Sequence, residues 1–230
     1  MPLNTTWKNL MLCFDIGANR GDFTLAALSK GYDVVALEPA PKVFSKLVGN
    51  FIYNPRVTPL RFAVSTTNYD RVEFYEADED GLSTLNQDWL TSDAMPYNGK
   101  PFRTISATTI TLDKLALIYG VPDLIKIDVE GAEWQVFKGL GSKMGTIAFE
   151  WTLETMQEHQ QQIEYLMHLG YTEVGCQYIV KHCEEPTTWH NIRKFNLTKW
   201  HNKNKTYWIE GGWKEANLRP TADVGMLWVR

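Results

Sequence analysis

The sequence lacks the features that would assign it to a specialised class of protein. No apolar run approaches the ~18–20 residues of a membrane-spanning helix, and the first residues do not show the charged and then apolar pattern of a signal peptide. The only cysteines are Cys13, Cys176 and Cys183, and their spacing matches no metal site. These absences predict a cytoplasmic protein with reduced thiols and no membrane span.

A large excess of either charge is also absent, since the 230 residues carry a net charge of only −4. This low charge disfavours nucleic acid as the main partner. Residues 181–219 nevertheless hold eight Lys or Arg and four Asp or Glu, so a basic segment accompanies an acidic body. Such a segment suits an anionic substrate, a phosphate-rich polymer, another domain or simply a solvated surface loop.

With 44% hydrophobic residues, the chain is long enough for one domain with a full core. We divide it into a core over residues 11–176, a variable substrate-side segment over 177–223 and a closing strand over 224–230. In the core, apolar runs alternate with amphipathic stretches, which is typical of a parallel sheet covered by helices. The expected strands are 11–16, 33–37, 57–64, 123–129, 146–151 and 171–176, and the expected helices are 21–30, 43–51, 111–119, 132–140 and 153–169.

One polar, turn-rich stretch, residues 66–109, interrupts this alternation and predicts an inserted hairpin. The expected fold is therefore α/β, a Rossmann-like doubly wound sheet with an inserted hairpin region and an aromatic-rich C-terminal segment. In such a sheet, ligands bind at the carboxyl ends of the strands.

Residues 15–21, Asp-Ile-Gly-Ala-Asn-Arg-Gly, connect the first expected strand to the first expected helix. Backbone N–H groups at a helix N-terminus attract anionic groups, and Gly17 allows a sharp turn close to a ligand. A dinucleotide fingerprint has glycines at its first, third and sixth positions, but Asn19 occupies the third position here. The loop therefore predicts a smaller adenosyl ligand with an amino-acid tail rather than a nicotinamide or flavin dinucleotide.

An acidic residue, Glu38, ends the second expected strand, 23 residues after Asp15. A carboxylate there can accept hydrogen bonds from both ribose hydroxyls of an adenosyl cofactor. The glycine loop, the spacing and the acid together predict an S-adenosylmethionine site of class I methyltransferases.

Residues 124–133, Leu-Ile-Lys-Ile-Asp-Val-Glu-Gly-Ala-Glu, resemble the signature of FkbM-type methyltransferases. The glycine loop, Glu38-Pro39 and residues 82–85 and 111–115 support the resemblance, which covers residues 11–151 in the right order. Enzymes of this family use S-adenosylmethionine and mostly methylate hydroxyl groups of sugars and small molecules. Because family domains often belong to longer chains, a longer multidomain protein is one expectation.

The resemblance also implies a cofactor site. The methionine end would lie at the glycine loop and the first helical turn, the ribose at the end of the second strand, and the adenine after the third strand. The residues in this order are Asp15, Gly17, Ala18, Asn19, Gly21, Phe23 and Thr24; Glu38 and Pro39; and Ala63, Val64 and Ser65.

Methyl transfer to an alcohol requires alignment of the acceptor oxygen and a base that takes its proton. Asp128 and Glu130 are the candidate bases, and Glu150 ends the neighbouring strand. Either Lys126 or a divalent cation (Mg²⁺ or Mn²⁺) held by Asp128 and Glu150 could offset their charge. His159 is an alternative base, but its place on the apolar face of a helix favours a partly buried, hydrogen-bonded histidine without a catalytic role.

Residues 178–213 contain seven aromatic side chains among Lys and Arg. They could form a wall that stacks on sugar rings, or a small core beneath a long loop. The rings belong to Tyr178, Trp189, Phe195, Trp200, Tyr207, Trp208 and Trp213.

The sequence therefore predicts an O-methyltransferase that acts on a hydroxyl group of a carbohydrate or glycoconjugate. A lipid, polyketide or nucleic-acid hydroxyl remains open as the acceptor. A non-catalytic module that binds the cofactor, and a dehydrogenase, are the alternatives from other classes.

Overall fold

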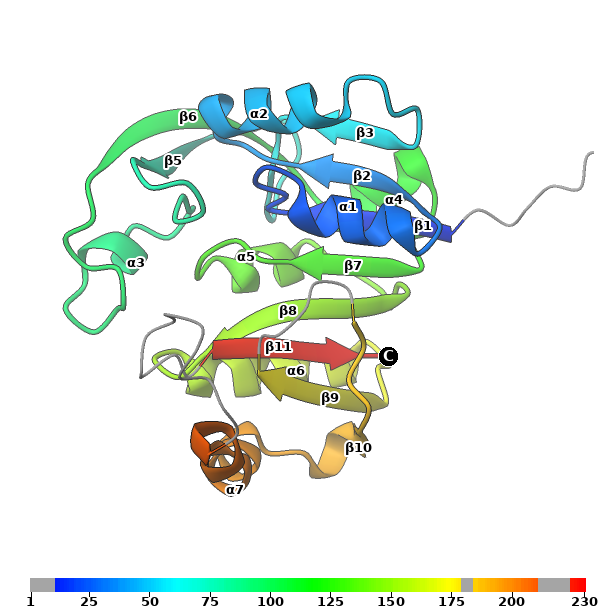
Figure 1. Cartoon of the computed structure of the whole chain (residues 1–230), viewed down its shortest axis with the longest axis vertical. Coiled ribbons are helices and arrows are strands. Elements are labelled where there is room, and N and C mark those ends of the chain that lie inside the picture. Colours follow the sequence, from blue (N-terminus) through cyan, green and yellow to red (C-terminus); the bar gives the residue numbers. More distant parts are fainter. Residues whose placement is uncertain (1–10, 179–183, 211–223) are drawn as a thin grey trace, which may run out of the picture.

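The computed structural model describes residues 11–178, 184–210 and 224–230, without the side chains of residues 205–210. An eight-stranded sheet forms its centre, with the order β10-β9-β11-β8-β7-β1-β2-β3 (Figure 1). The strands are β1 Met11–Ile16, β2 Tyr32–Leu37, β3 Val57–Leu60, β7 Leu124–Ile127, β8 Thr146–Thr152, β9 Glu173–Tyr178, β10 Trp189–Asn191 and β11 Val224–Val229.

Five of these strands, β1, β2, β3, β7 and β8, pair in parallel. β11 inserts between β8 and β9 and runs antiparallel to both. The sheet reverses its order at β1, between β2 on one side and β7 on the other. This topology confirms the predicted Rossmann-like α/β fold of class I methyltransferases.

Helices cover both faces of the sheet because alternate strand residues face opposite sides. Phe14 and Ile16 pack in one core with α4 Leu112–Tyr119, α5 Glu133–Lys138 and α6 Met156–His168. Cys13 and Ala36 pack in a second core with α1 Asp22–Ser29 and α2 Pro41–Phe51. Figure 1 shows these two helical layers on either side of the sheet.

The inserted hairpin is confirmed and occupies nearly all of the predicted stretch 66–109. β5 Arg71–Ala77 and β6 Phe102–Ile110 pair antiparallel, and the short helix α3 Asp88–Thr91 lies in their connection. The predicted strand 57–64 is wrong as one element, because β4 Ala63–Val64 leaves the main sheet and pairs with Thr109 and Ile110 in a second sheet. The insertion lies beyond the carboxyl ends of β1, β2 and β7 (Figure 1).

The C-terminal segment contains structure that the sequence pattern did not predict. α7 Leu197–Glu210 packs beside α6, preceded by a 3₁₀ turn over Ile192–Lys194. The rings of Tyr178 and Trp200 contact Trp151 at 5.7 and 6.2 Å between centroids, and Tyr178 and Phe195 are buried. For these rings the small core, and not the sugar wall, is the observed arrangement.

Trp189, a further aromatic residue of this segment, packs against the second core and not against this one. Trp189 lies under the Arg230 guanidinium, 4.0 Å from its ring centroid. Trp213 and the side chains of Tyr207 and Trp208 lie outside the described residues, as does Cys183. Within the described ranges, no helix is both long enough and apolar enough to cross a membrane.

Candidate active site

A cavity opens at the carboxyl ends of the strands on which the order of the sheet reverses. Its walls come from the glycine loop after β1, the end of β2, the loop after β7, and the insertion. The lining residues that the sequence predicted are Gly17, Asn19, Glu38, Pro39, Ala63, Val64, Asp128 and Glu130. The lining residues that were not predicted as cofactor contacts are Ile16, Val43, Phe62, Phe74, Gly81, Ser83, Leu85, Val129 and Ala132.

Gly17 lets the loop after β1 approach the end of β7. Its φ is +74°, and a Cβ atom at this position would lie 1.9 Å from the carbonyl oxygen of Asp128. Asn19 also has a positive φ of +49°, which turns the chain back toward Glu38. Gly21 is needed for packing, since its Cβ would lie 2.2 Å from the Phe51 ring.

Three backbone N–H groups of this loop donate to β2 and to the residue that follows it. Gly17 and Ala18 both donate to the carbonyl oxygen of Leu37, at 3.0 and 2.8 Å. Asn19 donates to Glu38 Oε2 at 3.0 Å. These hydrogen bonds attach the loop to the end of β2.

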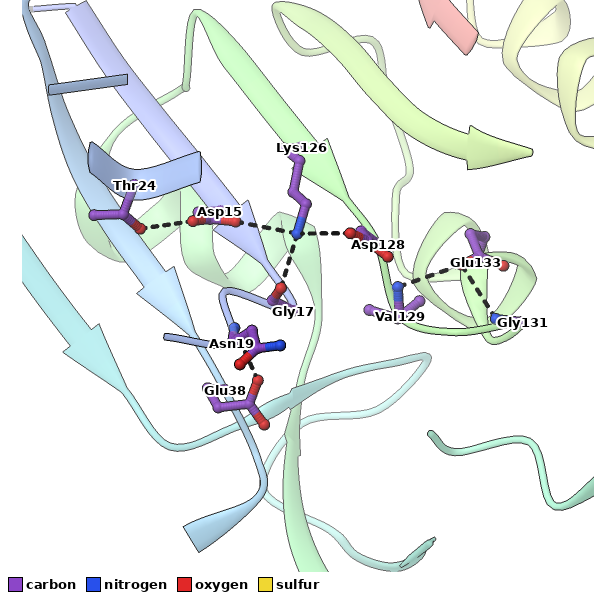
Figure 2. A network of polar contacts seen from close by, with 10 residues as sticks. All are labelled: Asp15, Gly17, Asn19, Thr24, Glu38, Lys126, Asp128, Val129, Gly131 and Glu133. Atoms are coloured by element: carbon purple, nitrogen blue, oxygen red, sulfur yellow. Dashed lines mark hydrogen bonds and ion pairs between the residues drawn. The ribbon is translucent and has the colours of Figure 1, made fainter. Parts of the chain in front are cut away.

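Glu38 is fixed at the end of β2 by two donors. Oε2 accepts from Asn19 and Oε1 accepts from the N–H of Ala40 at 2.9 Å (Figure 2 shows the Asn19 contact). The residue is 7% exposed, and burial raises the pKa of its carboxyl to about 7 against the lowering effect of these hydrogen bonds. It faces the cavity as a rigid acceptor that titrates near neutral pH.

A buried charge network connects β1 with the end of β7, its neighbour in the sheet (Figure 2). Lys126 Nζ lies 3.5 Å from Asp15 Oδ1 and 3.3 Å from Asp128 Oδ2, and it donates to the carbonyl oxygen of Gly17 at 2.8 Å. Thr24 Oγ1 donates to the other oxygen of Asp15 at 2.6 Å. Asp15 and Thr24 thus support the loop from beneath and do not line the cavity.

Lys126 remains charged in this network. Burial opposes the charge, but the carboxylates of Asp128 and Asp15 outweigh it and raise the pKa of the ammonium group above its ordinary value. A lysine held in this way neutralises its neighbours and does not exchange protons with a substrate.

Asp128, Glu130 and Glu150 come together beside the cavity, each with one carboxylate oxygen within 4.8 Å of the others. Burial, followed by repulsion from Asp128, raises the pKa of the Glu130 and Glu150 carboxyls well above the ordinary value. Glu130 has a φ of +56°, and its Oε2 accepts from the indole N–H of Trp89 at 3.0 Å. Three carboxylate oxygens at this spacing could hold a metal ion, and Glu130 lies beside the predicted pair of Asp128 and Glu150.

Glu133 begins α5, and its carboxylate contacts the backbone of the loop that precedes the helix. Its Oε1 accepts from the N–H groups of Val129 and Gly131, both at 3.3 Å, which closes the loop after β7 (Figure 2). Burial raises the pKa of its carboxyl to about 7. This contact is that of an acid at a helix N-terminus.

His159 does not reach the cavity. Its Nε2 accepts from the N–H of Thr152 at 3.2 Å and lies 2.7 Å from the Thr155 hydroxyl, while Nδ1 lies 2.8 Å from Gln162 Oε1. Burial lowers the pKa of the ring to about 4. A neutral ring with both nitrogens occupied matches the buried histidine of the second interpretation, not the base of the first.

Phe23 and Ser65, two other predicted cofactor contacts, also lie outside the cavity lining. Phe23 is buried in the core beneath α1. Ser65 follows β4 and donates its backbone N–H to the Ile110 carbonyl at 3.0 Å. Both residues support the chain segments that line the site.

The insertion contributes Phe74, Gly81, Ser83 and Leu85 to the lining of the cavity. Asp80 forms an ion pair with Lys46 of α2 and lies 3.9 Å from Arg20 of the glycine loop. In the sequence, only the motif at residues 82–85 pointed to this wall. It supported the family resemblance, but no role was assigned to its residues. Pairing of β5 with β6 brings it over the site.

Comparison with known proteins gives one family match over most of the chain. The model of the methyltransferase FkbM domain matches residues 15–173. The hexuronic acid methyltransferase AglP of Haloferax volcanii is 27% identical over 139 residues, which cover 59% of this chain and 52% of that protein. The match with this curated relative thus spans about half of its length.

Solved structures of methyltransferases are also similar to this chain. The precorrin-6y C5,15-methyltransferase of Geobacter metallireducens is 14% identical with a TM-score of 0.43, covering 98% of this chain and 82% of its own. Fibrillarin of Aeropyrum pernix with bound S-adenosyl-L-methionine is 11% identical with a TM-score of 0.44, covering 97% of this chain and 67% of its own. At these values they add nothing to the topology described above.

Proposed function

The chain belongs to the FkbM methyltransferase family, and from this premise we propose that it is an S-adenosylmethionine-dependent O-methyltransferase acting on a hydroxyl group of a carbohydrate or glycoconjugate. One observation carries the proposal: a single cavity has a fixed hydrogen-bond acceptor, Glu38, on one wall and the carboxylates of Asp128 and Glu130 on another. Glu38 can accept hydrogen bonds from the ribose of the cofactor. The carboxylates of Asp128 and Glu130 can take the proton that leaves the acceptor hydroxyl.

The cofactor supplies a methyl group on a sulfonium, which the acceptor oxygen attacks as the carbon–sulfur bond breaks. In this proposal Glu38 receives the ribose hydroxyls, and Ala63 and Val64 flank the adenine. Gly17 and Asn19 flank the methionine end, while the Asp15–Lys126 pair holds the loop in shape.

Glu130 and Asp128 are the proposed bases. Burial raises the pKa of the Glu130 carboxyl, which makes its carboxylate form a stronger base than an ordinary carboxylate, and this base can take the hydroxyl proton as the oxygen attacks. Lys126 balances the charge of Asp128 throughout. A divalent cation at Asp128, Glu130 and Glu150 would offset the remaining charge and stays a prediction.

The carbohydrate acceptor is supported by the family and by the name of the Haloferax volcanii relative. The acidic side of the cavity favours a neutral hydroxyl over a carboxylate acceptor, because negative groups repel an anionic substrate. The buried rings of Tyr178 and Phe195 give this part of the proposal no support. A cytoplasmic location also stays a prediction.

Transfer of a labelled methyl group from S-adenosylmethionine to a panel of neutral and acidic glycans tests the proposal. We expect label in neutral glycans, and we expect Asp128→Asn to lower kcat by about 10²–10⁴-fold. Binding of S-adenosylhomocysteine, measured by calorimetry, should change by less than about threefold in the same variant, because this product carries no sulfonium charge. Asp93→Asn, an exposed change in the insertion, is the matched control.

Three outcomes would change the proposal. Label in no glycan but in lipid or polyketide hydroxyls would replace the acceptor class. Cofactor binding without transfer to any acceptor would support a non-catalytic module. Transfer that survives exhaustive chelation would remove the divalent cation.

A further inference from the structure

The insertion contacts the loop after β7 at two points, and neither contact has a role in the site as described so far. Asn86 Nδ2 donates to the carbonyl oxygen of Gly131 at 3.0 Å, and Trp89 Nε1 donates to Glu130 Oε2 at 3.0 Å. Asn86 and Trp89 are 45 and 41 residues away from their partners in the sequence. These contacts connect α3 directly to the acidic side of the cavity.

The Trp89 ring is fixed where it lies. It is 1% exposed, and the Tyr97 ring lies 5.7 Å away between centroids. A Cβ atom at Gly131 would lie 2.5 Å from the indole, so only a glycine there lets the ring pack directly against the backbone. The indole therefore cannot move away without unpacking the insertion.

Glu130, in contrast, depends on outside contacts for its orientation. Its φ of +56° is rare for a residue with a long side chain, and Gly131 follows with a φ of +80°. Such a conformation persists only where the surroundings hold it. The bond from Trp89 is the contact that restrains the Glu130 carboxylate itself.

We propose that Trp89 is a positioning residue that holds Glu130 Oε2 and leaves Oε1 directed to the acceptor. An indole N–H can only donate, so the oxygen that it binds is the unprotonated one. The acceptor proton therefore goes to Oε1. This inference rests on the proposed function in that it takes Glu130 as the group that meets the acceptor.

Trp89→Phe keeps an aromatic ring but removes the donor, and methyl transfer should reveal the difference. We expect kcat to fall by about ten- to hundredfold, as for the loss of one hydrogen bond to a charged group, with the acceptor KM changed by less than about threefold. Trp89→His, which retains a ring N–H, should recover part of the loss. Tyr53→Phe, which removes a donor from a ring that is 94% exposed, should leave kcat unchanged.

A second measurement needs neither activity nor a variant of Trp89. In ¹⁵N-tryptophan-labelled protein, the indole proton of Trp89 should exchange slowly with solvent, and Glu130→Ala should speed this exchange by about tenfold or more. If the wild-type protein transfers methyl groups but Trp89→Phe leaves kcat intact, the positioning role is wrong while the proposed function stands. If no transfer occurs at all, the proposed function fails. If Glu130→Ala does not change the exchange rate of the indole proton, the Trp89–Glu130 hydrogen bond is wrong, whatever the activity.

Discussion

Glu38→Gln is the substitution that examines the cofactor site most closely. The side chain is nearly the same size, so the packing at the end of β2 should persist. The amide has only one oxygen, however, whereas the two carboxylate oxygens accept from Asn19 and Ala40. One backbone donor therefore loses its partner, and the negative charge that faces the cavity disappears.

The magnitude follows from the two ribose hydroxyls that the carboxylate is proposed to bind. Hydrogen bonds to a charged group exceed those to a neutral group by ~1 kcal/mol each, which gives a loss of ~2 kcal/mol. This loss corresponds to an increase of about thirtyfold in the Kd of S-adenosylhomocysteine. Glu164→Gln, on the exposed side of α6, should not change the Kd.

The same carboxyl predicts a pH dependence in the wild-type protein. With a pKa of about 7, raised by burial, Glu38 is charged in about one molecule in ten at pH 6 and about nine in ten at pH 8. If only the charged form holds the ribose, the Kd falls about tenfold from pH 6 to pH 8. The dependence should be absent in Glu38→Gln.

Stability should change with pH in the opposite direction. Because the folded pKa lies above the ordinary 4.5, Glu38 contributes stability that is fully present below about pH 4.5 and is lost as the pH rises through about 7. Calorimetric titrations at several pH values measure the binding, and urea unfolding measures the stability. A Kd that neither the substitution nor the pH alters would refute the role of Glu38.

Three further predictions concern the frame of the site. Gly17→Ala should lower the free energy of unfolding by ~2–4 kcal/mol, because its Cβ would overlap the Asp128 carbonyl. Gly49→Ala, which has open space around it, should have little effect, and equal urea midpoints for the two variants would contradict this prediction. Lys126→Met should cost ~3–5 kcal/mol because it leaves two carboxylates without their cation, and a variant as stable as wild type in urea would show that the network is not needed. His159→Gln should lower stability by ~1–3 kcal/mol without changing the kcat or KM of methyl transfer, and a large fall in kcat would restore His159 as a candidate base.

Much of the fold could be predicted because its signals are local. Apolar runs such as 11–16 and 124–127 identify buried strands, and the turn residues that follow them mark the carboxyl ends where the cavity lies. Glu38 and Asp128 were found for the same reason, since a polar residue that ends an apolar strand faces that edge of the sheet. These inferences need only neighbouring residues.

The residues that were missed depend on contacts between distant segments. Trp89 and Phe74 reach the site because β5 pairs with β6 and because Asp80 pairs with Lys46, which no local pattern reveals. The split of residues 57–64 has the same origin, since β4 pairs with residues near 110.

Composition also cannot distinguish a buried ring from an exposed one. Tyr178 and Phe195 were candidates for a sugar-binding wall, but they fill the space beneath α7. His159 presented the same ambiguity, which its partners Thr152 and Gln162 resolve.

The most direct test of the account is a crystal structure of the protein with S-adenosylhomocysteine. We predict that the ligand occupies the cavity between the glycine loop and the insertion, with both ribose hydroxyls on the Glu38 carboxylate and the sulfur toward Asp128. A ligand bound elsewhere, or bound in the cavity with its ribose away from Glu38, would contradict the account.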